Sequence, residues 1–252
     1  GFGQLSWKPM ILGQRLELTG GLRYTHDSRS IDETSIPTPQ PFAGQLPNPG
    51  ATPGPSRTGD LSFSNWSYLG SISFQWTPDI LTYARFSTGY KSGGFDARAG
   101  VDLATGVTFP FTFKPEKATS YEVGFKSEFL DHRLRLNGSL FRTDYDDLQV
   151  PQYAGGNGFI PNANARYQGF ELELLAIPIR RVQFDASLGY VDPTYTEFLL
   201  ADPNTGIVGD YAKQAKFPYV PNWTVHVGAQ ASHRLDFADL MLRVDYAQTS
   251  KR

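Results

Sequence analysis

The residues of this chain best suited to acid–base chemistry are two carboxylates spaced two apart, Glu171 and Glu173. On a β-strand, residues i and i+2 point to the same side, so both carboxylates share one face. Such a pair has the composition of a general acid and a general base. The polar face of a strand in contact with water carries carboxylates just as readily, and no G-x-S-x-G nucleophile turn accompanies the pair. We therefore expect no enzyme activity and assign no catalytic residue.

Metal binding has two candidate groups of residues. Asp144, Asp146 and Asp147 offer oxygen ligands of the kind that Ca²⁺ prefers, but the glycine and bidentate glutamate of an EF-hand loop are missing, so solvated acids are the better interpretation. The chain has no cysteine, which excludes thiolate ligands and disulfides. Its histidines are scattered, at His26, His132, His226 and His233. We expect no metal site and no cofactor.

Phosphate or nucleic-acid binding has little support. The pairs Gly93-Gly94 and Gly155-Gly156 do not open a helix and lack the Lys-Ser/Thr of a phosphate loop, so they indicate flexible loops. A formal net charge of −2 gives no electrostatic reason to expect a nucleic acid as partner.

Aromatic side chains in the expected loops are the remaining candidates for ligand contact. They stack on a ligand or pack within their own loops, and the sequence leaves both alternatives open. The residues concerned are Phe109, Phe111, Phe113, Tyr153 and Phe159.

The element that organises the chain is a predicted hairpin from Ser120 to Val150, with a short turn at residues 130–133. Apolar side chains alternate with polar ones along both strands. One face collects Tyr121, Val123, Phe125, Phe129, Leu134, Leu136 and Leu140, and the other collects Glu122, Lys126, Glu128, Arg135, Asn137 and Ser139. This pattern alone does not tell whether the apolar face meets a protein core or lipid.

Similar alternation predicts ten strands in all. Outside the hairpin, they are centred on about Gly1–Trp7, Gln14–Asp27, Leu61–Thr77, Leu81–Lys91, Gln168–Ile177, Phe184–Tyr190, Trp223–Ala231 and Phe237–Tyr246. Short connections at Pro9, Pro78, Asp131, Pro178 and Leu235 alternate with long ones at about Ser30–Asp60, Ser92–Lys117, Pro151–Asn162 and Leu199–Pro218. The first of these long connections contains seven prolines, which cannot donate to a ladder.

The alternation of short and long connections is typical of bacterial outer-membrane barrels. There is no run of about 18 apolar residues, which excludes a membrane-spanning helix, but a barrel strand needs only about 9 to 11 residues. Tryptophans near strand ends fit an aromatic girdle. The sequence thus predicts an all-β, antiparallel up-and-down transmembrane β-barrel portion, with about ten strands in a meander, short periplasmic turns and long extracellular loops. A soluble glycan-binding β-sandwich is the alternative.

Several motifs resemble those of one family, the TonB-dependent outer-membrane receptors, in the second half of their β-barrel domain. The resemblance depends on the order and spacing of these motifs together. They are Gly89-Tyr90-Lys91-Ser92-Gly93-Gly94-Phe95, Phe113-Lys114-Pro115-Glu116, residues 120–126 and 141–150, Gln168-Gly169-Phe170-Glu171-Leu172-Glu173, Gly189-Tyr190 and Pro221-Asn222-Trp223.

The resemblance implies a 22-stranded barrel filled by an N-terminal plug, in the outer membrane of a Gram-negative bacterium. Such a receptor imports iron–siderophore complexes or other scarce nutrients. The implied partners are the lipid bilayer and lipopolysaccharide, the plug domain, the energy-coupling TonB complex and the ligand. A passive porin-like or surface-binding barrel remains an alternative function.

Three departures from the family pattern indicate a fragment. No plug or signal peptide precedes Gly1, the chain ends at Arg252 rather than at an aromatic residue, and ten strands are fewer than half the expected number. Residues 1–252 are therefore expected to form part of one barrel domain. Its first and last strands should lie open as edges, or pair with each other in a strained closure, and we favour the open sheet.

The two faces of the predicted sheet can be assigned residue by residue. Leu16, Leu18, Leu22, Val123, Phe125, Leu134, Leu136, Leu172, Leu174, Phe184 and Leu188 are predicted to face lipid. Glu17, Glu122, Lys126, Asn137, Glu171 and Asp185 are predicted to face the lumen.

Overall fold

The computed structural model describes residues 1–34, 56–99, 110–154, 157–202 and 207–251. Its described part is almost entirely β-structure, with one short 3₁₀ helix, η1 (Ile11–Gln14). None of the helices in these ranges is long and apolar enough to cross a membrane.

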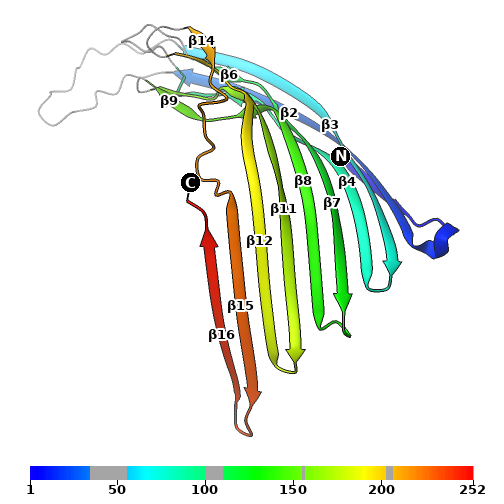
Figure 1. Cartoon of the computed structure of the whole chain (residues 1–252). Coiled ribbons are helices and arrows are strands. Elements are labelled where there is room, and N and C mark those ends of the chain that lie inside the picture. Colours follow the sequence, from blue (N-terminus) through cyan, green and yellow to red (C-terminus); the bar gives the residue numbers. More distant parts are fainter. Residues whose placement is uncertain (35–55, 100–109, 155–156, 203–206, 252) are drawn as a thin grey trace, which may run out of the picture.

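Ten long strands form one antiparallel sheet in which each strand pairs with the next long strand along the chain (Figure 1). The strands are β1 (Phe2–Trp7), β2 (Leu16–Thr34), β3 (Ser56–Thr77), β4 (Ile80–Lys91), β7 (Glu116–Phe129), β8 (Leu134–Gln149), β11 (Asn162–Ile179), β12 (Val182–Glu197), β15 (Trp223–Arg234) and β16 (Asp239–Thr249). The predicted meander of about ten strands is confirmed.

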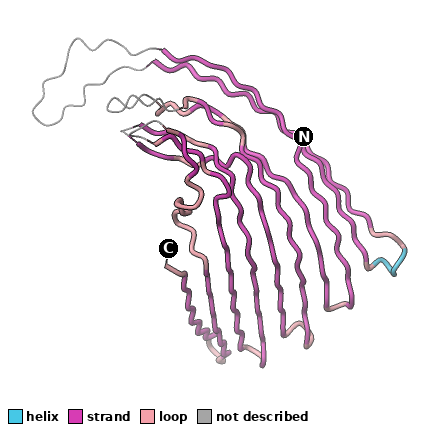
Figure 2. The backbone as a smooth tube through the Cα atoms, turned by 45° about the horizontal axis from the view of Figure 1, so that its top comes forward, coloured by secondary structure: helices cyan, strands magenta, loops and turns pink. Residues whose placement is uncertain are grey.

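The sheet curves but does not close (Figure 2). Within the described part, β1 pairs only with β2 and β16 pairs only with β15, so they form the two edges. This is the open sheet favoured from the sequence. Each edge leaves a row of backbone N–H and C=O groups available for a further strand.

The strand register sorts the side chains into two faces as predicted. Leu136 lies opposite Leu174, and the next residue, Asn137, lies opposite Glu173. Carried from strand to strand, this alternation puts all eleven predicted lipid-facing residues on one side, called the apolar face, and all six predicted lumen-facing residues on the other, called the polar face.

The apolar face is uncovered. Leu140 is 60% exposed and Leu242 is 66% exposed, although both are on the central part of their strands. The buried apolar residues of the described part are instead Ala99, Phe159, Ala163, Ala165, Tyr195 and Phe198, at or beyond the outer ends of the strands. Among the described residues, no second sheet packs on the leucine-rich face, so the β-sandwich alternative is wrong.

The four tryptophans all lie on the apolar face and are exposed. Trp66, Trp76 and Trp223 contact aromatic neighbours: Tyr24 and Trp66 have ring centroids 4.8 Å apart, Phe74 and Trp76 are 4.7 Å apart, and Tyr190 and Trp223 are 4.6 Å apart. Trp66 is not near a strand end, contrary to the sequence-based expectation, because β3 begins at Ser56. The aromatic belt is otherwise as expected for a barrel wall.

Two boundaries differ from the predicted ones. β2 continues to Thr34 and β3 starts at Ser56, so both ends of the predicted loop Ser30–Asp60 are strand, and its seven prolines lie outside the described residues. Pro178 does not end β11, which extends to Ile179. It lies where the pairing with β12 shifts register between Ala176 and Ile179, a place where its missing N–H costs no ladder bond.

The predicted long loops also contain short paired ribbons, which the sequence analysis missed. They are β5 (Gly94–Phe95) with β6 (Thr112–Phe113), β9 (Gln152–Ala154) with β10 (Asn157–Phe159), and β13 (Leu199–Ala201) with β14 (Val208–Asp210). Strands of two or three residues are too short to show a periodicity in sequence.

The turn between β7 and β8 is tight and specific. Leu130, Asp131 and His132 all have positive φ, at 57°, 54° and 63°. Glu128 stabilises the turn by accepting hydrogen bonds from His132 at 2.6 Å and Arg135 at 2.7 Å. These contacts fix the register of the central hairpin.

Candidate functional site

The centre of the polar face holds an acidic hollow of about 180 Å³ between β4 and β11. Both predicted carboxylates, Glu171 and Glu173, line it together with Glu122. Tyr83 donates a hydrogen bond to Glu122, and Asn137 donates one to Glu173 at 3.3 Å. Both carboxylates therefore lie on the open polar face, beside polar side chains of the neighbouring strands.

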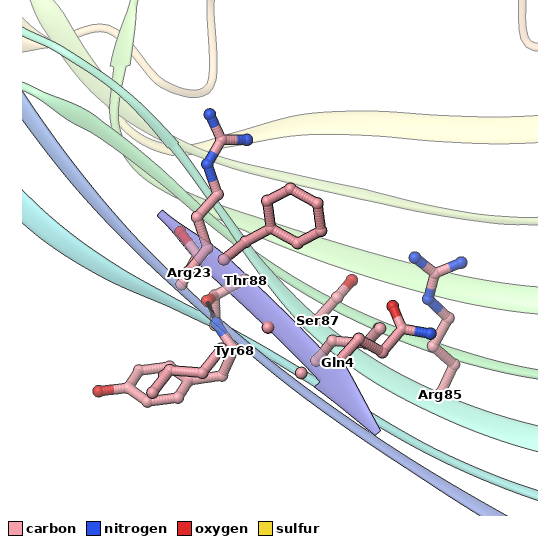
Figure 3. A pocket seen from close by; sticks show the side chains of 12 residues that line it. Gln4, Arg23, Tyr68, Arg85, Ser87 and Thr88 are labelled. Carbon is pink, nitrogen blue, oxygen red and sulfur yellow. Dashed lines mark hydrogen bonds between the residues drawn. The ribbon is translucent and has the colours of Figure 1, made fainter. Parts of the chain in front are cut away.

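A second hollow, of about 440 Å³, lies over Gly21 near β1 (Figure 3). Its lining includes Gln4, Ser87 and two arginines, Arg23 and Arg85. Figure 3 shows both guanidinium groups on one side of the sheet, with Tyr68 on the other side. Neither arginine forms an ion pair within the described ranges, although Arg85 lies opposite Glu122 in the register, so Arg23 adds positive charge at this end of the polar face without an acidic partner.

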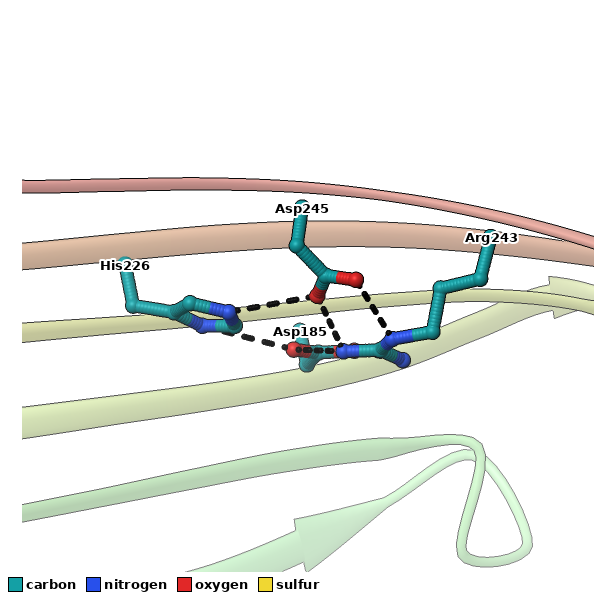
Figure 4. Close-up of polar contacts among 4 residues, drawn as sticks. All are labelled: Asp185, His226, Arg243 and Asp245. Carbon is teal, nitrogen blue, oxygen red and sulfur yellow. Dashed lines mark hydrogen bonds and ion pairs between the residues drawn. The ribbon is translucent and has the colours of Figure 1, made fainter.

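A third group joins β12, β15 and β16 on the polar face (Figure 4). Arg243 donates to Asp185 at 3.0 and 3.1 Å and to Asp245 at 2.6 and 3.0 Å. His226 lies 3.6 Å from Asp185 and 3.3 Å from Asp245. Two carboxylates and an imidazole within 4.8 Å of one another could ligate a cation, but the Arg243 guanidinium already supplies the positive charge between them.

Sequence reasoning missed this cluster, although it placed Asp185 on the polar face. Asp185 and Arg243 are 58 residues apart, and only the register brings them together across Gly228. A Cβ on Gly228 would come within 2.6 Å of Asp185 Oδ2 and 2.7 Å of Arg243 Nη2. Any other residue at position 228 would therefore push the ends of these charged side chains aside.

The predicted aspartate group does not converge on one point. Asp144 is bound by Arg142 and Arg166 on the apolar face, whereas Asp147 pairs with Lys114 at 3.2 Å. Asp146 lies opposite Lys117 in the register. Each acid has a basic neighbour of its own.

The five aromatic candidates are distributed among the outer loops. Phe111 is half-buried against Phe95, with ring centroids 5.2 Å apart, and the Arg57 guanidinium lies 5.2 Å from its ring centre. Phe113 is half-buried beside Gly94. Phe159 is buried, the backbone of Tyr153 lies in β9, and Phe109 falls outside the described residues. Phe111 and Phe159 thus pack within the layer that the long connections form beyond the outer ends of the strands, called the loop layer below.

The loops that carry these aromatics contact one another. Gly158 N donates to Arg98 O at 3.3 Å, which links β10 to the connection after β5. Arg98 also forms an ion pair with the buried Asp96 at 2.9 Å. These hydrogen bonds from Arg98 hold the pKa of the Asp96 carboxyl below its usual range. These contacts tie the described part of the connection after β5 to β10.

A further aromatic group, missed from the sequence, covers the polar face near the outer ends of β8, β11 and β12. We call it the outer aromatic cluster: Tyr145, Tyr167, Tyr195, Phe198 and Phe217. Tyr195 stacks on Phe217, with ring centroids 4.0 Å apart, and on Phe198 at 4.8 Å. Phe217 comes from the connection before β15, so that connection folds onto the wall instead of extending away from it.

A single curved sheet with an uncovered apolar face and a polar opposite face is the wall of a transmembrane β-barrel. The family model described as TonB dependent receptor-like, beta-barrel matches residues 1–252. The chain therefore belongs to the TonB-dependent receptor family and represents part of its barrel domain.

Individual relatives agree with this assignment. The chain is 29% identical over 177 residues to the pesticin receptor of Yersinia enterocolitica, covering 68% of this chain and 22% of that protein. It is 26% identical over 131 residues to the probable TonB-dependent siderophore receptor PiuA of Acinetobacter baumannii, covering 52% of this chain and 17% of that protein. The chain thus spans about a fifth of the length of these relatives.

Solved structures share the fold. The ferric yersiniabactin uptake receptor FyuA from Yersinia pestis superposes with a TM-score of 0.71 at 21% identity, covering 98% of this chain and 33% of that one. The copper transporter OprC superposes with a TM-score of 0.65 at 18% identity, covering 92% of this chain and 33% of that one. At such identities the likeness concerns the fold alone.

Proposed function

We propose that this chain is part of the wall of an outer-membrane receptor that imports an iron–siderophore complex with energy from the TonB complex. The observation that carries the proposal is the family match over residues 1–252. Relatives described as a siderophore receptor and as a ferric-pyoverdine receptor favour this ligand class. The relatives are transport receptors, and we assign no enzymatic step to this chain.

The faces of the sheet suggest where the partners bind. The apolar face would contact the bilayer and, in its outer leaflet, lipopolysaccharide, in the outer membrane of a Gram-negative bacterium. The polar face would contact the plug domain of the intact receptor, and the TonB complex would act through that plug. Arg23 and Arg85, which form no ion pair within the described ranges, offer this face a docking point for acidic groups.

The loop layer is the proposed site of first contact with the ligand. Phe109, Phe111, Phe113, Tyr153 and Phe159 are proposed to contribute to it, directly or by supporting the loops that do. Aromatic rings with a few polar groups between them suit a bulky ligand that has both apolar and polar parts. The outer aromatic cluster lies between this layer and the polar wall, on the route inward.

Uptake by the full-length receptor tests the proposal. Cells that lack other siderophore receptors would express it, and accumulation of radioactive iron supplied as a panel of ferric siderophores would be measured with and without an intact TonB complex. We expect uptake of at least one ferric siderophore that depends on TonB. Uptake that is independent of TonB would indicate a passive porin, and the absence of iron uptake across the panel would refute the ligand class.

A further inference from the structure

Two arginines share one carboxylate on the apolar face, at the outer ends of β8 and β11. Asp144 accepts hydrogen bonds from Arg142 Nε at 2.8 Å and Nη2 at 3.1 Å, and from Arg166 Nε at 2.8 Å. The three side chains therefore carry a net charge of +1. They are called the Arg142–Asp144–Arg166 triad below.

Donor groups remain free in the triad. Within the described ranges, Arg142 Nη1 and both terminal nitrogens of Arg166 donate to no protein group. The side chain of Arg142 is 48% exposed and that of Arg166 is 36% exposed. Hydrogen bonds to the shared Asp144 carboxylate hold both guanidinium planes in place. Less side-chain entropy is therefore lost when a further acceptor binds.

The level of the triad on the wall follows from the register. Arg142 lies opposite Tyr121, an exposed residue whose ring packs on Phe86 with centroids 5.4 Å apart. One step toward the turns, the apolar face is formed by Leu140, Phe170, Tyr190 and Trp223. The triad is thus the first cationic group beyond the aromatic belt, on the side of the long loops.

At this level of a barrel wall, the aromatic belt meets the lipid headgroups. Guanidinium groups bind phosphate oxygens through paired, charge-assisted hydrogen bonds. Two further sets of charges lie on this face near the triad: Lys117 lies opposite Asp146, and the Asp192 carboxylate accepts from the neutral Gln168 amide at 3.4 Å and keeps its charge. The free donors of Arg142 and Arg166 therefore offer an anionic headgroup its hydrogen bonds at the arginine end of the triad, away from these carboxylates' own partners.

The other arginine cluster of the wall provides a contrast. Arg243 lies between two carboxylates, which leaves that group with no excess positive charge, and it is on the polar face. Arg23 and Arg85 form no ion pair within the described ranges, but they point to the polar face. Among the described arginines of the sheet, the triad combines excess positive charge, free donors and a lipid-level position.

We propose that Arg142 and Arg166, held in place by Asp144, form a binding site for a phosphate group of lipopolysaccharide in the outer leaflet. The site rests on the proposed outer-membrane placement of the chain. It is separate from the nutrient route, because it lies on the opposite face of the sheet.

Binding of lipid A to the purified full-length receptor tests this site. Native mass spectrometry would compare bisphosphorylated lipid A with the same lipid lacking its phosphates. We expect the wild-type receptor to retain the phosphorylated form preferentially, and R142Q/R166Q to bind it about tenfold more weakly, since each cation near a charged membrane surface contributes modestly. The matched control, R23Q/R85Q, removes two cations from the polar face and should bind as the wild type does.

Each contrary result has a defined meaning. If the wild-type receptor binds both lipids equally well, the proposed phosphate site is wrong. The proposed site is also wrong if R142Q/R166Q binds the phosphorylated lipid as tightly as the wild type does. Competition by millimolar inorganic phosphate would identify a general anion site and overturn the assignment to lipopolysaccharide. TonB-dependent iron uptake, measured in parallel, should survive R142Q/R166Q, so failure of the transport proposal is seen separately from failure of this one.

Discussion

Gly228 leaves the space through which Arg243 contacts Asp185. The Arg243 guanidinium crosses it to reach Asp185, and a Cβ would meet both groups at less than 3 Å. We expect Gly228→Ala to displace the ends of these side chains and to destabilise the full-length barrel by about 1 kcal/mol or less, because a partly exposed ion pair contributes only that much. Urea unfolding in lipid vesicles measures this.

The control for that substitution is Gly20→Ala on the apolar face. Nothing lies within 4 Å of a Cβ at Gly20, so this change should be close to neutral. If both alanine variants unfold at the same urea concentration as the wild type, the Asp185–Arg243 contact does not constrain Gly228.

Leu136 and Asn137 are neighbours that point to opposite faces. In the full-length receptor, Leu136→Arg should cost roughly 2–4 kcal/mol because it puts a charge into the hydrocarbon region, whereas Asn137→Arg should cost far less because that site faces the polar side. Refolding titrations into vesicles provide the comparison. Equal losses would refute the assignment of the faces.

The ion pair between Asp96 and Arg98 predicts an acid sensitivity of the loop layer. Hydrogen bonds from Arg98 lower the pKa of Asp96, which is only 5% exposed. Because the folded-state pKa is depressed, the stabilisation is present above the ordinary value of about 3.9 and is lost as the pH falls through the folded-state pKa. Hydrogen exchange at the Arg98 amide, which donates to Asp96 at 3.0 Å, should therefore accelerate in acid relative to its intrinsic rate.

Asp96→Asn is the control for that measurement. It removes the ionisable group, so exchange at Arg98 should be faster at neutral pH, with no further acceleration in acid beyond the intrinsic rate. Persistence of the wild-type acid response in this variant would assign it to another group.

For individual residues, the sequence predicted which face of the sheet a strand residue occupies, but it did not predict which distant residues contact one another. Alternation assigns Glu171 and Asp185 to the polar side without knowledge of the partners. The Asp185–Arg243 pair depends on the register of three strands, and the triad depends on which of several acids near Asp144 meets two arginines. Such pairings need the strand order and offset, which periodicity leaves undetermined.

Deletions in the short turns and deletions in the long loops are expected to have different effects on the receptor. Deleting His132 should impair assembly of the full-length barrel, since three consecutive residues of positive φ set the register of β7 and β8. Deleting residues 200–209, which include most of the β13–β14 ribbon, should leave assembly intact and weaken ferric-siderophore uptake. Heat-modifiable migration on gels reports assembly, and iron uptake reports function.

The opposite pattern would invert the proposed orientation. If the loop deletion leaves ligand affinity unchanged while the turn deletion abolishes ligand binding in a correctly assembled barrel, the turns rather than the loops meet the ligand.

The long strands were predictable as elements, but their outer extensions were not. β2 and β3 continue beyond the membrane-length segment as a paired ribbon that reaches Thr34 and Ser56. Polar residues occur on both sides of this extension, so the alternation that marks the wall fades there. The connection that contains Phe217 was correctly placed as a long loop, but its return onto Tyr195 depends on aromatic packing between distant segments.

On the scale of the whole molecule, the sheet has two open edges and one uncovered apolar face. β1 and β16 each offer an unpaired ladder, as expected for a portion of a larger barrel. The apolar face exposes more apolar side chain than a surface in contact with water normally does, as expected of a barrel wall that meets lipid. Both features are explained if further strands of the receptor continue the wall on either side.

The central claim is that the apolar face meets lipid and the polar face does not. Because the chain has no cysteine, single-cysteine substitutions introduced into β8 can each carry one spin label. Labels at positions 134–141 of the full-length receptor in membranes would be tested for collision with oxygen, which concentrates in lipid, and with a water-soluble nickel chelate. The account predicts high oxygen access at positions 134, 136, 138 and 140 and low oxygen access at the residues between them. Oxygen access that does not alternate, or that is higher at 135, 137 and 139, would contradict it.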